Sequence, residues 1–311
     1  MKLMMESPSH LTHIEKEERR RVFWSVYVLD RLAACGRGRP PAVIDACCSL
    51  QLPTDEETWR SGDFKETANL EQFSCRTLKT AQRLAPFAHT VVMAHTMCRG
   101  AQYMLQQFNI RNRDPPWDAN SEFASIDSDL LYLESFLETW RSPAELVAQY
   151  VSPDGHVDQH SAGPAVFSRT LFHLCYCLIH HPFLLRRRLD SCTMAAPSSF
   201  LSRAFKTAWE HAKRMTSLLQ EARKAGAIVC TSFYGYCSIV AGTIAAFRLH
   251  SSFQREAAEL LQTIVAFVED IGRFWKNVSS MAWPSASIAG RTIMTNIALG
   301  VHTTTFFGRQ L

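Results

Sequence analysis

Histidine and cysteine side chains, which can bind transition metals, are concentrated in the segment LFHLCYCLIHH at residues 171–181. On a helix, His173, Cys177 and either His180 or His181 would share one face. A zinc site needs four ligands, and neither a fourth ligand nor a CxxC pair accompanies these three. We therefore predict buried thiols and hydrogen-bonded histidines, with no metal and no cofactor in this chain. The alternative is a helical small-molecule-binding protein or enzyme with a pocket near His173, Tyr176 and His180.

Motifs that would indicate an enzyme do not occur in the sequence. Neither the nucleophile motif G-x-S-x-G nor the zinc-protease motif H-E-x-x-H is present. The glycines at positions 36 and 38 precede Arg39, Pro40 and Pro41. A turn stiffened by proline cannot present the row of free N–H groups that binds a phosphate. We predict that the chain is not an enzyme.

Arginines frame the stretch RRRVFWSVYVLDRLAACGRGRPPAVID at residues 19–45, which could be a nucleic-acid-binding arm or a helix. The preceding acids nearly neutralise the first arginines, because residues 15–21 read EKEERRR. Thr12 and Glu15 have the spacing of a capping box, which predicts that a helix begins here. The net charge of the whole chain is only +4. This charge gives no electrostatic basis for tight nucleic-acid binding.

The predicted helix is apolar on nearly every side. Between residues 22 and 34 only Ser25, Asp30 and Arg31 are not apolar, so we expect the helix to be enclosed on most sides. Gly36 is expected to end it.

Asp30 and Arg31 are costly inside such a helix unless each finds a partner. We hypothesise that the following loop folds back, so that Arg37 or Arg39 meets Asp30 and Asp45 reaches Arg31. The alternative is that these charged groups extend along the surface to reach water.

Helical periodicity also dominates the rest of the chain. Apolar residues recur every three or four positions in four stripes, at residues 87–108, 126–140, 201–222 and 253–274. Strand-like alternation is sustained nowhere. Polar connections between the stripes are predicted to be surface loops, at residues 53–64, 111–120, 152–164 and 189–199. We predict an all-α fold built as a single large multi-helix domain with irregular surface loops.

Composition indicates an intracellular globular protein. Apolar residues make up 47% and charged residues 20% of the chain, which argues against disorder. The ten cysteines have no disulfide framework spacing, and we interpret them as reduced, buried thiols. Residues 225–247 carry no charge and are long enough to span a membrane, but their many glycines and hydroxyl residues favour a central helix of a soluble domain. The basic run at residues 186–188 is expected at a solvated helix end.

One ordered set of residues resembles the fungal-specific transcription factor domain, the helical middle homology region of fungal binuclear zinc-cluster transcription factors. The resemblance rests on a basic pair, an aromatic helix, an Asp-Arg doublet and a Gly-Arg-Pro turn, followed by an acid and a proline. The residues are Arg20, Arg21, Phe23, Trp24, Tyr27, Leu29, Asp30, Arg31, Gly38, Arg39, Pro40, Pro41, Ala42, Asp45, Leu52 and Pro53. Residues 171–185 and 198–247 are similar to later helices of the same family.

The resemblance implies a nuclear regulator of transcription, with a domain at residues 14–250. Residues 1–13 would be a lead-in, and residues 251–311 a helical extension of the domain. Zinc would be bound only by a six-cysteine cluster that these residues do not contain, and DNA would be contacted only through that cluster. A co-regulator protein, a second copy of the chain or a small effector are the partners implied, with no membrane. The sequence departs from the family at residues 46–48, Ala-Cys-Cys, where a second acid is common.

Overall fold

The structure, a computed structural model, is mostly helical in the part of the chain that it describes. It describes residues 10–35, 40–45, 50–77, 84–105, 114–190, 192, 194–249 and 254–281. The helices are α1 (His13–Ala33), α2 (Glu56–Ser61), α3 (Leu70–Ser74), α4 (Pro86–Leu105), α5 (Glu122–Leu137), α6 (Pro143–Ala148), α7 (Gln159–Ile179), α8 (Pro182–Leu189), α9 (Ser198–Lys224), α10 (Ser232–Arg248), α11 (Gln254–Gly272) and α12 (Lys276–Met281). Within these residues the only β pairing is two isolated bridges, so the all-α prediction is confirmed.

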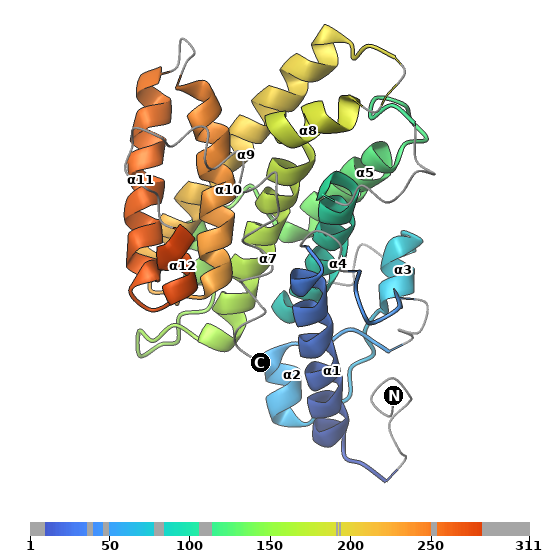
Figure 1. Cartoon of the computed structure of the whole chain (residues 1–311). Helices are drawn as coiled ribbons and strands as arrows, with labels where there is room; N and C mark the ends of the chain where they lie inside the picture. Colours follow the sequence, from blue (N-terminus) through green and yellow to red (C-terminus); the bar gives the residue numbers. More distant parts are fainter. Residues whose placement is uncertain are drawn as a thin grey trace.

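Helix α7 lies at the centre of the molecule, between α4 on one side and α9 on the other (Figure 1). Helices α10 and α11 pack on α9 and on each other, and α1 packs on α4. The approach of α4 to α7 is close at Gly100, where an added Cβ would lie 2.9 Å from the Cys175 sulfur. This crossing therefore requires a residue without a side chain.

The helix starts follow local sequence signals. Thr12 and Glu15 form the predicted capping box at the start of α1. The same arrangement begins α6, where Ser142 and Glu145 exchange hydrogen bonds. Each box gives side-chain acceptors to two backbone N–H groups at the start of the helix, which would otherwise lack a partner.

The predicted apolar stripes form the core, with exceptions at their ends. Val91, Ala94 and Cys98 on α4 are buried, as are most matching positions on the other stripes. Leu201, in the first turn of α9, is 41% exposed, and Leu260 is partly buried. Trp140 and Phe274 are exposed, because each lies beyond the end of its helix. Two predicted loops are partly wrong. Residues 56–61 form α2, where Asp55 caps the first turn, and residues 159–164 already belong to α7.

The prediction that α1 is enclosed on most sides is wrong. Trp24, Val28 and Leu32 are buried, but Val22, Val26 and Leu29 are 53%, 51% and 59% exposed. These three positions recur at helical spacing and therefore form one open face. Because nearly every position in the segment is apolar, the sequence does not indicate which face of the helix is buried.

The structure places the most membrane-like helix, and some of the cysteines, differently from the sequence predictions. One helix among the described residues, α7, is long and apolar enough to cross a membrane, and 83% of its most apolar window is buried inside the protein. This burial is typical of a core helix. Helix α10 begins only at Ser232, so residues 225–231 do not extend it. Cys175, Cys177 and Cys237 are buried as predicted, whereas Cys230 is exposed, and residues 47 and 48 lie outside the described residues.

Candidate functional site: the α1 anchor and a polar pocket

Paired charges attach the first half of α1 to the segment that leads into α2. The buried Glu17 carboxylate accepts the Thr54 backbone N–H at 2.9 Å and pairs with Arg20 and Arg21. Arg21 also pairs with Glu56 and donates to the Thr54 carbonyl at 2.9 Å. These contacts join residues more than thirty positions apart.

A second network holds the other end of α1. Arg31 is 1% exposed, and its guanidinium lies 2.5 Å from an Asp45 oxygen and 2.7 Å from the Val43 carbonyl. The Tyr27 hydroxyl donates to Asp45 at 2.6 Å and contacts His95 of α4 at 3.0 Å. The expected pairing of Asp45 with Arg31 is therefore present, and Arg31 does not extend to water.

Electrostatic interactions in this network keep the Asp45 carboxyl charged and the Tyr27 phenol neutral. Burial alone would raise the pKa of Asp45, but hydrogen bonds from His95 and Tyr27 and the positive charge of Arg31 hold this pKa well below its usual value. Burial raises the pKa of Tyr27, so the phenol stays neutral and acts as a donor. We call the set Tyr27, Asp30, Arg31, Asp45 and His95 the α1 anchor.

The described partners of Asp30 are backbone N–H groups and Arg31, whereas the predicted partners, Arg37 or Arg39, lie outside the described residues. The Asp30 carboxylate accepts the backbone N–H groups of Ala42 and Val43 at 2.9 and 3.0 Å and lies 3.0 Å from Arg31. The loop does fold back onto α1, as predicted. Gly38 also lies outside the described residues.

The remaining residues of the resemblance have packing positions. Phe23 and Trp24 are buried edge to face, and the Trp24 indole N–H donates to the Gln51 carbonyl at 2.8 Å. Pro53 is buried beside this contact, and Pro40 is exposed. The set thus divides into aromatic core residues and charged residues that attach the returning chain.

The histidines singled out by the sequence form a buried ring cluster. The His173 Nδ1 lies 3.0 Å from the His211 Nδ1, and the Tyr176 ring lies 4.0 Å from the His211 ring between centroids. Burial lowers the pKa of His173 to about 3 and that of His211 to about 2, so both are neutral at pH 7. His180 stacks on Tyr176 and lies 3.9 Å from Asp127.

Metal binding finds no support in this arrangement. Among the described residues no group of three or more histidine, cysteine or acidic side chains could hold a metal ion. The donor set of a six-cysteine zinc cluster is therefore not assembled by these residues. The pocket described next is not lined by the histidine cluster.

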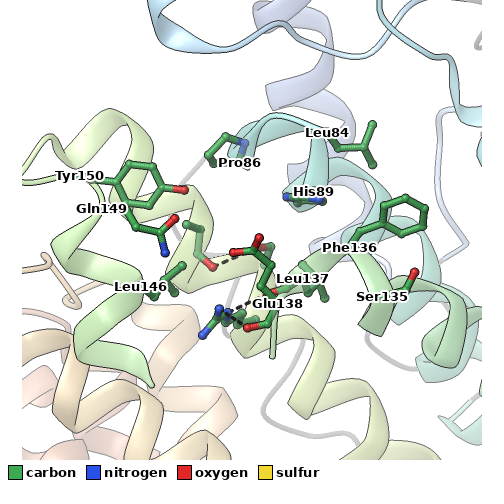
Figure 2. A pocket seen from close by; sticks show the side chains of 13 residues that line it. Leu84, Pro86, His89, Ser135, Phe136, Leu137, Glu138, Leu146, Gln149 and Tyr150 are labelled. Carbon is green, nitrogen blue, oxygen red and sulfur yellow. Dashed lines mark hydrogen bonds between the residues drawn. The ribbon is translucent and has the colours of Figure 1, made fainter. Parts of the chain in front are cut away.

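A polar pocket of about 330 Å³ lies where α4, α5, α6 and α7 meet (Figure 2). Its apolar wall comes from both halves of the chain. The lining residues are Leu84, Pro86, His89, Ser135, Phe136, Leu137, Glu138, Leu146, Gln149, Tyr150, Ala165, Ser168 and Arg169. We call it the Arg169 pocket.

Arg169 is 3% exposed and is held by neutral acceptors alone. Its guanidinium donates to the backbone carbonyls of Leu137, Glu138 and Arg141 at 3.0, 2.6 and 3.0 Å. No carboxylate of the described residues lies within ion-pair distance of it. The Leu137 and Glu138 carbonyls end α5, where the chain leaves the helix through Glu138 at φ +46°, and the Arg141 carbonyl belongs to the turn that precedes α6. Arg169 therefore satisfies carbonyls that a helix end leaves open, and its positive charge suits that end of the helix dipole.

The charge of Arg169 persists at neutral pH. Burial lowers its pKa to about 10, which still leaves it protonated at pH 7. The Glu138 carboxylate lies nearby but forms an ion pair of 2.8 Å with Arg141. The three groups together carry a net charge of one positive unit.

His89, on the first turns of α4, adds a polar group without a partner. Its Nε2 is buried and makes no hydrogen bond within the described structure. Burial and the charge of Arg169 lower the pKa of His89 to about 4, so the ring is neutral and one tautomer donates from Nε2. Figure 2 shows Tyr150 and Gln149 lining the pocket beside Leu146. Burial raises the pKa of Tyr150, which keeps its hydroxyl a donor.

Sequence reasoning missed this pocket. Arg169 is the one basic residue inside the apolar helix at residues 159–179, and that isolation was the available signal. Its partners come from a turn about thirty positions earlier, so no local pattern indicates them.

Comparison with known sequences connects the chain to one family. Residues 3–142 match the family described as the fungal specific transcription factor domain. The chain is 24% identical over 283 residues to the Zn(2)-C6 fungal-type transcription factor FTF1c of Fusarium oxysporum f. sp. lycopersici, covering 86% of this chain and 29% of that protein. It is 27% identical over 219 residues to the ascochitine biosynthesis cluster transcriptional regulator of Didymella fabae, covering 68% of this chain and 34% of that protein. The chain thus spans about a third or less of the length of these relatives. No solved structure matches it significantly.

Proposed function

We propose that this chain, whose residues 3–142 match the fungal specific transcription factor domain, acts as the regulatory region of a zinc-cluster transcription factor. In this role it modulates transcription through a small effector or a protein partner, and DNA is bound by a zinc cluster elsewhere in the full-length protein. The domain extends in this proposal over residues 14–250, with residues 251–311 as its helical extension. The site of action is the nucleus.

One observation carries the proposal beyond the family match. The Arg169 pocket lies at the boundary of the matched region, with Ser135, Leu137 and Glu138 inside it and Tyr150 and Arg169 outside it. A ligand there would contact α4 and α5 of the family domain and α6 and α7 of the following part together. Occupancy of such a site can change how the two parts pack, which is the structural basis of effector control.

A tethering assay tests the regulatory role. The chain is fused to a heterologous DNA-binding module and expressed in yeast with a reporter carrying that module's sites. We expect reporter transcription to differ at least several-fold from that with the module alone. An Arg31→Met fusion should lose the effect, because the α1 anchor supports the fold, whereas the exposed-site control Arg255→Met should keep it. Equal transcription with the intact fusion and with the module alone would contradict the proposal.

DNA binding by the isolated chain is a separate test. Because the net charge is +4, we expect only weak binding to duplex DNA, without preference for sequence. Fluorescence anisotropy across a salt series measures it. Tight, sequence-selective binding with a steep loss of affinity as salt rises would contradict the assignment of DNA reading to another part of the protein.

A further inference from the structure

We propose that the Arg169 pocket binds the carboxylate of a small organic acid, with Arg169 and His89 holding the anion and the apolar wall covering the body of the ligand. The proposed function is needed only for the regulatory role of this site, and the binding of the acid does not depend on it.

The balance of charge indicates an anion. Arg169 is buried, and no carboxylate among the described residues pairs with it, while Glu138 is paired with Arg141. Three carbonyls accept from Arg169, and the nearby Glu138 carboxylate stabilises its charge without pairing with it. An anion that enters the pocket can therefore form the ion pair that Arg169 lacks among the described residues. The net charge of these three side chains is one positive unit, which matches a monocarboxylate. A phosphate dianion would bring more negative charge beside Glu138 than the site neutralises.

Hydrogen-bond donors remain for such a ligand. A guanidinium has five N–H groups, and three bonds hold Arg169 to backbone carbonyls. Two N–H groups are therefore left. The buried Nε2 of His89 adds a third donor, and the Tyr150 hydroxyl, which also lines the pocket, adds a fourth. A carboxylate has two oxygens that accept several such bonds.

The ends of two helices act in opposite directions on the pocket. The carbonyl end of α5 is negative, but its last carbonyls already accept from Arg169. The N-terminus of α4 is positive, and its first residue, Pro86, lines the pocket. Pro86 has no N–H group, so the helix can contribute its dipole there but no hydrogen bond from this residue. Arg169 therefore largely neutralises the negative end of α5, whereas the positive end of α4 favours an anion.

The size and lining of the pocket define the rest of the ligand. A volume of about 330 Å³ is at the lower end of the range for small-molecule sites. Leu84, Phe136, Leu146 and Ala165 supply apolar surface to the pocket. The class that fits is a compact acid with one carboxylate and an apolar body.

Isothermal titration of the purified chain tests the proposal with defined probes. The probes are acetate, hexanoate and 3-phenylpropanoate, each compared with its neutral amide. We expect the two acids with apolar bodies to bind and to bind at least about tenfold more tightly than their amides, because only the acids make charge-assisted hydrogen bonds. Failure of all three acids to bind, or equal binding of acid and amide, would overturn the proposal.

Variants separate binding from folding. His89→Leu and Tyr150→Phe remove one donor each without touching the carbonyls that Arg169 holds, and each should weaken acid binding about three- to tenfold. Arg169→Gln should abolish it if the variant folds, as judged by circular dichroism, and Arg255→Gln, remote and exposed, should change nothing. Unchanged affinity in His89→Leu and Tyr150→Phe together would place the acid elsewhere. If the acids bind the purified chain but the fusion does not change reporter transcription, the carboxylate site stands and its regulatory role does not.

Discussion

Two buried arginines in this protein have different partners. Arg31 in the α1 anchor lies against the carboxylates of Asp30 and Asp45, and its charge is cancelled within the fold. Arg169 donates to three backbone carbonyls and has no carboxylate partner among the described residues. The first arrangement only holds the chain together. The second holds a helix end and also leaves a positive charge beside a pocket.

The largest expected effect comes from removing Arg31. In Arg31→Met, Asp30 and Asp45 lose their cation, and we expect the free energy of unfolding to fall by about 3 kcal/mol. The exposed pair of Arg255 and Glu259 gives the control, with a loss of less than about 0.5 kcal/mol in Arg255→Met. Urea unfolding followed by circular dichroism measures both. A loss as small as that of the control would show that Arg31 is not an anchor.

Arg169→Met should cost less, about 2 kcal/mol, because it leaves three carbonyls without a charged donor but no carboxylate without a cation. The same urea titration applies. In the presence of an acid that binds the wild type, the stability of this variant should not rise. A loss equal to or larger than that in Arg31→Met would remove the distinction between the two arginines.

The pH dependence of the α1 anchor should follow Asp45. The pKa of this carboxyl is lowered in the folded state, so its stabilising contribution is present above the unfolded pKa near 4 and is lost as pH falls below it. Because Asp45 is half exposed, we expect a loss of only about 1 kcal/mol between pH 6 and pH 2.5. The stability difference between the wild type and Asp45→Asn, measured at several pH values, isolates this group. A difference independent of pH would contradict the role of Asp45.

The smallest effect is proton uptake at His89. Burial and Arg169 lower its pKa to about 4, so its neutral form stabilises the fold above pH 6.5, a contribution that is lost as pH falls toward 4. A bound carboxylate offsets the charge of Arg169 and should raise this pKa. Titration of 3-phenylpropanoate at pH 5 in two buffers of different ionisation enthalpy measures the protons exchanged on binding. The partly protonated acid releases protons in both proteins, so we expect the wild type to take up a fraction of a proton more than His89→Leu does. Equal uptake in that variant would assign the proton to another group.

Local signals allowed much of the α1 anchor to be predicted. Thr12 and Glu15 fixed the start of α1, and Asp45 could be matched to Arg31 because only fourteen residues separate them. The open face of Val22, Val26 and Leu29 was not predictable, because an apolar residue at nearly every position has no periodicity. The backbone partners of Asp30 were also missed, since main-chain donors leave no mark in a sequence.

The Arg169 pocket could not be predicted for a related reason. Its main contacts join a side chain to backbone carbonyls, and Glu138 takes a left-handed conformation that its residue type does not indicate. The isolation of Arg169 in an apolar helix was visible, but the turn that surrounds it depends on how α5 and α6 pack on α7. The fold class was readable from periodicity, whereas this site depends on tertiary packing.

The most direct test of the difference between the two arginines is crystallographic. Crystals of the chain soaked with 6-bromohexanoate would locate the bromine by its anomalous signal. We predict bromine among the apolar residues of the Arg169 pocket, with the carboxylate within hydrogen-bond distance of Arg169 and His89, and none at Arg31. An empty Arg169 pocket, or an acid bound at the α1 anchor instead, would contradict this account.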